Sequence, residues 1–180
     1  MLDELISYLE REGRNWIVTQ RDAHWVKGHP LESKTRRVIG SFFQSDTLNS
    51  ARICEVSQIE NPPFYKELEE QGISMPLDFR NMAGITFIDT IFIAPSKIGA
   101  ESWSSLVFHE CVHVAQYLFL GVDRFAHEYV TGWANNRFDY SKIPLEVQAY
   151  RLQQLFDLNP QNMFSVEMEI AQKSGQYEIG

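Results

Sequence analysis

The residues with the clearest capacity for chemistry are His109, Glu110 and His113, which form a His-Glu-x-x-His motif. Side chains four positions apart lie on one face of an α-helix, so both imidazoles can bind one metal ion at about 2 Å. Glu110 lies about 100° around the helix from His109, outside the first ligand position but close enough to hold a water molecule. The motif is typical of zinc sites in which the glutamate is the general base, taking a proton from water and passing it to a leaving amine.

The motif is uncommon by chance and has a polar setting. With 5 His in 180 residues, random placement gives such a pentapeptide in about one chain of this composition in a hundred. Buried polar side chains are costly unless something binds them, so a polar stripe on an otherwise apolar helix indicates a cleft lining rather than core histidines. The stripe consists of Ser102, Ser105, His109, Glu110, His113 and Gln116.

A catalytic zinc site has three protein ligands and one open position, and the sequence offers three candidates for the third ligand. His127 does not fit the longer motif with glycine and a third histidine, because positions 116 and 119 carry neither residue. Glu128 is expected on a solvated helix face. We predict Glu146, in the first turn of a separate helix that Pro144 opens and that Ala149 allows to approach closely. His127, Glu128 and the absence of a third ligand remain alternatives.

The elements that position these residues are predicted from periodicity and helix breakers. The motif helix is expected from about Glu101, in its first turn, to about residue 120, with Gly121 just past its end. A further helix is expected over 123–135, and Pro144 opens another that continues to about residue 156. Residues 85–88 and 90–94 are β-rich and predict either a hairpin or one long bent strand.

The N-terminal half contributes helices at 2–12, ending near Gly13, and at 34–43, with Ser33 as a candidate N-cap. Residues 52–59 predict a strand, and a short helix follows Pro62 and Pro63 and ends at Gly72. Together these elements predict one α+β domain over residues 1–180, mainly helical, with a small β-sheet or hairpin flanking the active-site helix.

The motif at 109–113, followed by Glu146-x-x-Ala149, resembles the gluzincin clan of zinc metallopeptidases, whose third ligand is a glutamate in such a helix. Residues 108–116 and 143–150 resemble small bacterial metallopeptidase domains of unknown function. The resemblance covers residues 84–156 and implies a zincin-like fold in which a β-strand beside the cleft pairs with an extended substrate. Residues 85–94 are the candidate for that strand.

The chain departs from the gluzincin pattern in the residue that orients a histidine. Many gluzincins have an aspartate four residues after the glutamate ligand, where this chain has Tyr150. Gln153 or a backbone carbonyl is left for that role. Transition-state stabilisation also needs a donor opposite the metal, for which Tyr140, Tyr150 and His127 are the candidates.

Composition limits the partners and the compartment. A net charge of −8 without a basic stripe argues against nucleic acid as a partner. No apolar run of about 18 residues predicts a membrane span, and the acidic N-terminus does not resemble a secretion signal. Cys54 and Cys111 do not form a disulfide framework, and Cys111 is expected as a buried thiol, so we expect a cytoplasmic protein.

The sequence therefore predicts a zinc-dependent metallopeptidase with one Zn²⁺ per chain on His109, His113 and Glu146 and with Glu110 as general base, acting on a peptide or protein. One alternative is a zinc-bearing protein-interaction module of the same fold without catalysis. A fourth protein ligand in place of water would favour that module. A second alternative is a metal-free helical interaction domain.

Overall fold

The computed structural model describes residues 2–99 and 102–173, which adopt an α+β fold in which helices predominate. The α-helices of this part are α1 (Leu2–His24), α2 (Ser33–Ile39), α3 (Ser45–Ser50), α4 (Phe64–Glu70), α5 (Trp103–Asn135), α6 (Pro144–Leu158) and α7 (Val166–Lys173). The strands are β1 (His29–Pro30), β2 (Arg52–Glu55), β3 (Gly84–Phe87) and β4 (Thr90–Ile93), and the short 3-10 helices are η1 (Phe79–Asn81), η2 (Pro95–Lys97) and η3 (Tyr140–Lys142).

The strands form one mixed sheet in the order β1-β2-β4-β3. β4 runs parallel to β2 and antiparallel to β3, and Phe87 lies opposite Thr90. Residues 85–94 therefore form a hairpin, one of the two predicted arrangements. The strand order places β3 at an edge of the sheet, and β3 also contacts α5.

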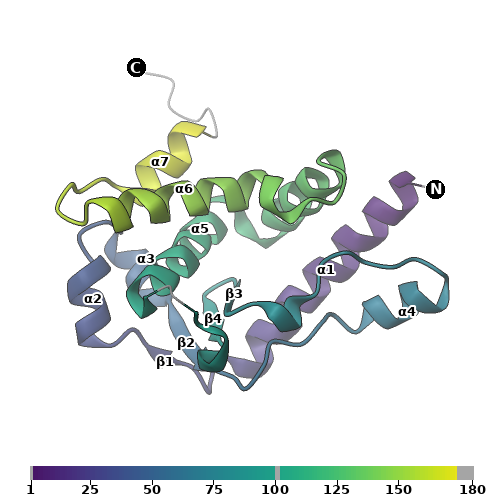
Figure 1. The fold of residues 1–180 in the computed structure, drawn as a ribbon, viewed down its shortest axis with the longest axis horizontal. Helices are drawn as coiled ribbons and strands as arrows, with labels where there is room; N and C mark the ends of the chain where they lie inside the picture. The colour runs from purple at the N-terminus through teal and green to yellow at the C-terminus, as the bar shows by residue number, and fades with distance from the viewer. Residues whose placement is uncertain (1, 100–101, 174–180) are drawn as a thin grey trace.

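The helix α5 is the centre of the fold. It lies between the sheet and α6, while α1 packs along it (Figure 1). Ser102 caps its N-terminus by accepting a hydrogen bond from the backbone N–H of Ser105, whereas Glu101 lies outside the described residues. The backbone of Gly121 leaves the helical conformation with φ 74°, so α5 consists of two helical segments joined at the predicted break.

Three predicted elements have boundaries that the structure corrects. The first helix does not end near Gly13 but continues to His24, because a helical glycine costs only about 0.5–1 kcal/mol relative to alanine and the residues beyond it pack on the core. The helix predicted over 34–43 ends at Ile39, and its N-cap is Glu32 rather than Ser33. The strand predicted over 52–59 ends at Glu55, so its register with β4 covers only its first half.

Two features bear on the expected compartment. In the described part of the chain, α5 is the one helix long and apolar enough to cross a membrane, but 72% of its apolar window is buried inside the fold, as in a core helix. Cys54 and Cys111 are both free and buried, and burial raises the pKa of the Cys111 thiol.

Candidate metal centre

Three predicted ligands meet between α5 and α6. His109 and His113 lie one turn apart on α5, and Glu146 lies in the first turn of α6. The two Nε2 atoms are 3.1 Å apart, and Glu146 Oε2 lies 3.4 Å from that of His109 and 3.5 Å from that of His113. All three residues are buried, and they form the one group of three potential ligands within the described residues that is compact enough to hold a metal ion.

The close contact between the two helices places Glu146. Pro144 opens α6 as predicted, and its ring packs on the backbone of Gly132, where an added Cβ would come within 2.5 Å of Pro144 Cδ. Ala149 is completely buried where α6 packs into the core. A small residue on each helix thus lets α6 approach α5 closely. The Glu146 carboxylate therefore reaches the two imidazoles from the α6 side.

Hydrogen bonds to Gln116 determine the tautomer of His113. The Gln116 side-chain amide donates to Leu145 O at 3.1 Å and to Gln148 Oε1 at 3.0 Å. Its oxygen therefore faces His113 Nδ1, 2.8 Å away, and can only accept. His113 Nδ1 must carry a hydrogen, which leaves the Nε2 lone pair of the neutral ring directed at Glu146.

A chain of hydrogen bonds from Asp157 through Ser105 and Gln153 determines the tautomer of His109 in the same way. The Ser105 hydroxyl donates to Asp157 at 2.7 Å and accepts from the Gln153 side-chain amide at 2.9 Å. The Gln153 oxygen then accepts from His109 Nδ1 at 3.0 Å. Gln153, one of the two candidates that the sequence left, orients the imidazole in this fold. In the polar stripe, Gln116 orients His113 directly and Ser105 orients His109 through Gln153.

The three converging atoms need a positive charge between them. Glu146 Oε2 is buried without a hydrogen-bond partner among the described residues. Burial alone would lower the pKa of His113, but the negative charge of Glu146 outweighs it and raises that pKa to about 9. Burial alone would raise the pKa of Glu146, but the charge on the imidazoles holds it well below its usual range. A proton or a metal ion can supply the charge.

The spacing of the three atoms suits a tetrahedral metal. Ligands at about 2.0–2.2 Å from a tetrahedral ion lie roughly 3.3–3.6 Å from one another. The observed separations of 3.1, 3.4 and 3.5 Å come close to this range without any movement of the backbone. The site can therefore hold a metal ion on the three predicted ligands.

Glu110 lines the same end of the cleft as the triad, on the side next to β3. The Thr86 hydroxyl donates to Glu110 Oε2 at 2.7 Å, and Oε1 lies against the backbone of Gly84, where a Cβ would clash with it. Burial raises the pKa of Glu110, and attraction to His109 and His113 offsets part of that rise. A buried carboxyl group in this position can take part in proton transfer to and from a bound molecule.

The other ligand candidates lie elsewhere. Glu128 accepts a hydrogen bond from Arg124 on the surface of α5 at 2.7 Å, as expected for a solvated face residue. His127 is exposed and contacts Glu10 of α1, so it contributes neither a ligand nor a donor at the triad.

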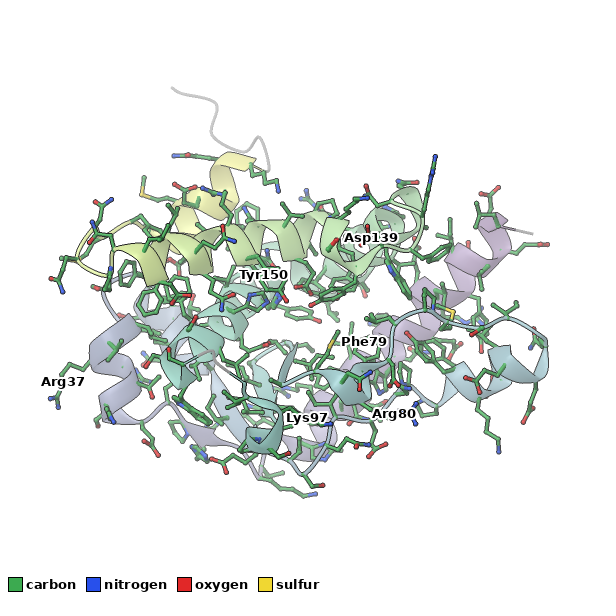
Figure 2. The ribbon with its side chains drawn as sticks, in the orientation of Figure 1. Arg37, Phe79, Arg80, Lys97, Asp139 and Tyr150 are labelled. Atoms are coloured by element: carbon green, nitrogen blue, oxygen red, sulfur yellow. The ribbon has the colours of Figure 1, made fainter. Side chains whose placement is uncertain are left out.

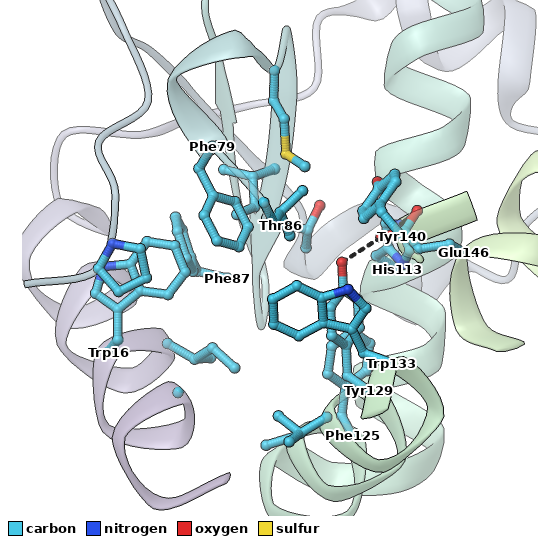
Figure 3. Close-up of a pocket in the computed structure, with 18 of the residues that line it drawn as sticks. Trp16, Phe79, Thr86, Phe87, His113, Phe125, Tyr129, Trp133, Tyr140 and Glu146 are labelled. Atoms are coloured by element: carbon cyan, nitrogen blue, oxygen red, sulfur yellow. Dashed lines mark hydrogen bonds and ion pairs between the residues drawn. The ribbon is translucent and has the colours of Figure 1, made fainter. Parts of the chain in front are cut away.

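Of the two tyrosines among the predicted donors, Tyr140 lines the cleft next to Glu146. Tyr150 lies on α6 with its ring 4.5 Å from that of His109, and it is partly exposed (Figure 2). Sequence reasoning missed Tyr129, whose hydroxyl donates to Glu146 Oε1 at 2.8 Å (Figure 3). The break at Gly121 was predicted from the sequence, but the direction of the second helical segment, which brings Tyr129 to Glu146, was not.

The triad opens into a cleft between α1, β3 and the second segment of α5. The cleft encloses about 860 Å³ of empty space, including solvent at its mouth. His109, Glu110, His113 and Glu146 line one end, and the walls beyond them are aromatic and aliphatic (Figure 3). An open, water-accessible side next to a buried ligand set is what catalytic metal sites require.

Comparison of this chain with protein-family models, with curated proteins and with solved structures finds no match.

Proposed function

We propose that this protein is a zinc-dependent peptide hydrolase with a zincin-like, gluzincin-type site, in which His109, His113 and Glu146 hold one Zn²⁺ and Glu110 is the general base. The observation that carries the proposal is the convergence of two lone-pair nitrogens and an orphaned carboxylate oxygen at the head of a cleft, beside a second buried carboxyl group.

The donor set favours zinc. Two imidazole nitrogens and one carboxylate oxygen form a common catalytic zinc site, whereas Ca²⁺ and Mg²⁺ prefer oxygen ligands alone. When bound, zinc lowers the pKa of water to near neutrality and polarises a carbonyl group.

The residues of the chain supply proton transfer and substrate alignment. Thr86 occupies one oxygen of Glu110, which leaves the other to accept a proton from water and deliver it to the leaving amine. Tyr129 holds the second oxygen of Glu146 and so orients that carboxylate. The edge strand β3, with Gly84 and Thr86 in the cleft wall, has a free side to which an extended peptide can add as a further strand.

The ligand count favours this activity over a non-catalytic zinc module. Structural zinc sites are closed by four protein ligands. Among the described histidines, cysteines and acidic residues, the group that could hold a metal has three members, and it faces the cleft. In a metal-free interaction domain, a proton on His113 would have to supply the charge at the triad.

The test is Glu110→Gln in zinc-loaded protein, assayed on a quenched mixed-sequence peptide library. Because Glu110 is not a ligand, we expect full zinc content with hydrolysis reduced at least about 10²–10⁴-fold. Glu128→Gln, which changes a carboxyl group on the surface of the same helix, should keep both the zinc content and the rate of hydrolysis. Activity of Glu110→Gln within a few-fold of the unchanged protein would show that Glu110 is not the base.

A further inference from the structure

Beyond the metal-facing end, the cleft carries no charge. Among the described residues that line it, there is no Lys, Arg or Asp, and the two glutamates are Glu110 and Glu146. One wall holds Trp16, Phe79 and Phe87, and the facing wall holds Phe125, Tyr129 and Trp133 (Figure 3). Trp16 packs edge-on to Phe87 with ring centroids 4.9 Å apart. An occupant of this space must be uncharged, and a flat ring would meet ring edges and faces on both sides.

Gly13 leaves room in the wall that α1 provides. Leu9, Gly13, Trp16 and Ile17 line the cleft from one face of the helix. A Cβ added at Gly13 would meet no atom within 4 Å, so neither packing nor a left-handed backbone requires glycine there. A glycine inside a helix weakens it, and at this position its effect is to keep a gap open toward the cleft.

Trp133 offers an unused hydrogen-bond donor in the same space. Its side chain is 4% exposed and packs with Tyr117 and Phe125. The indole Nε1 is buried without a hydrogen-bond partner among the described residues, although a buried indole N–H normally finds one. Because Trp133 lines the cleft, a bound molecule with an oxygen acceptor would satisfy it.

We propose that the cleft binds a peptide through a large, uncharged aromatic side chain, phenylalanine or tyrosine, which fills the gap at Gly13 while Trp133 donates its N–H to an oxygen of the peptide. This proposal rests on the proposed hydrolase function for the position of the scissile bond, since the aromatic site is continuous with the end that holds His109 and Glu110. In this arrangement, α1 determines which peptide side chain the cleft accepts.

The test measures binding without turnover. Acetylated, amidated pentapeptides Ala-Ala-Xaa-Ala-Ala, with Xaa as Phe, Ala or Lys, are titrated calorimetrically into zinc-loaded Glu110→Gln protein. The Phe peptide is expected to bind at least about tenfold more tightly than the other two, which corresponds to about 1.4 kcal/mol. Equal affinity for the three peptides, or a preference for Lys, would overturn the proposal.

Two variants locate the aromatic site. Gly13→Leu fills the gap and should reduce affinity for the Phe peptide to that for the Ala peptide, with a melting temperature no lower than before, because leucine is the better helix former. Asn15→Leu adds the same side chain to an exposed position of α1 and should change nothing. Unaltered Phe selectivity in folded Gly13→Leu would remove α1 from the site.

Trp133→Phe keeps an aromatic ring, although a smaller one, and deletes the N–H donor. It should weaken all three peptides about three- to tenfold, as expected for loss of one hydrogen bond, whereas Trp25→Phe, outside the cleft, should not. Full affinity in Trp133→Phe would refute the role of the indole N–H. Phe-selective binding without hydrolysis of any peptide by the unchanged protein would refute the hydrolase function and support the aromatic site. Hydrolysis without a preference for aromatic side chains would support the hydrolase function and refute the aromatic site.

Discussion

At the scale of single residues, two glutamines orient a pair of histidines so that they could hold a metal ion. Gln116 and Gln153 each accept a hydrogen bond from an imidazole Nδ1, so both Nε2 lone pairs face the same point. Glu146 brings its Oε2 to that point without any other partner among the described residues. The motif alone provides two ligands, and the third depends on a residue 33 positions after His113.

Replacing Glu146 tests the third ligand. Glu146→Ala should weaken zinc binding by at least about tenfold, because it removes a ligand and leaves the two imidazoles open to water. The zinc dissociation constant is measured by competition with a chromophoric chelator. Glu128→Ala, the nearest alternative in sequence, should bind zinc normally. The assignment fails if Glu128→Ala loses the metal and Glu146→Ala keeps it.

At the scale of elements, the site was predictable where the sequence contains helix breakers. Pro144 opens α6, and Gly121 interrupts α5 with a φ of 74°, so the end of the motif helix and the start of the helix of Glu146 were predicted correctly. Gly13, in contrast, lies inside a continuous helix, because α1 extends through it to His24. Tyr129 and Gln148 were not predicted as part of the site because their contacts depend on how α5 bends and α6 crosses it.

The contact between β3 and α5 gives a second prediction. A methyl group in Gly84→Ala would strike the Glu110 carboxylate, which must then rotate away from Thr86. We expect hydrolysis to fall at least about tenfold while zinc content is unchanged, since misplacing a general base loses much of its contribution. Gly99→Ala, where a Cβ meets open space, is the matched control. Equal activity of the two variants on the peptide library would show that β3 does not position Glu110.

At the scale of the whole molecule, the buried site couples metal binding, protonation and folding. Zinc and the proton that His113 binds with a pKa of about 9 would occupy the same space, so binding of the metal must release the proton. The triad joins α5 to α6 across the main core. Without a positive charge at the triad, the buried Glu146 carboxylate would be unpaired and the folded protein less stable.

We therefore expect the metal-free protein to lose stability as the pH rises. His113 binds its proton more tightly in the folded chain than in the unfolded chain, where its pKa is about 6.5. Its contribution, on the order of 3 kcal/mol, is fully present below about pH 6.5 and lost as the pH rises through about 9. Urea unfolding in chelator at both pH values measures it. The same pH dependence in His113→Gln would contradict this assignment.

The most direct test of the account is the metal content of the purified protein and of its histidine variants. We predict about one Zn²⁺ per chain by mass-spectrometric metal analysis, because the site offers one set of three ligands. His109→Ala and His113→Ala should each lose it, while His127→Ala, which changes an exposed histidine, should retain it. Undiminished zinc in both ligand variants, or no bound metal in the unchanged protein after zinc is supplied, would contradict the metal centre.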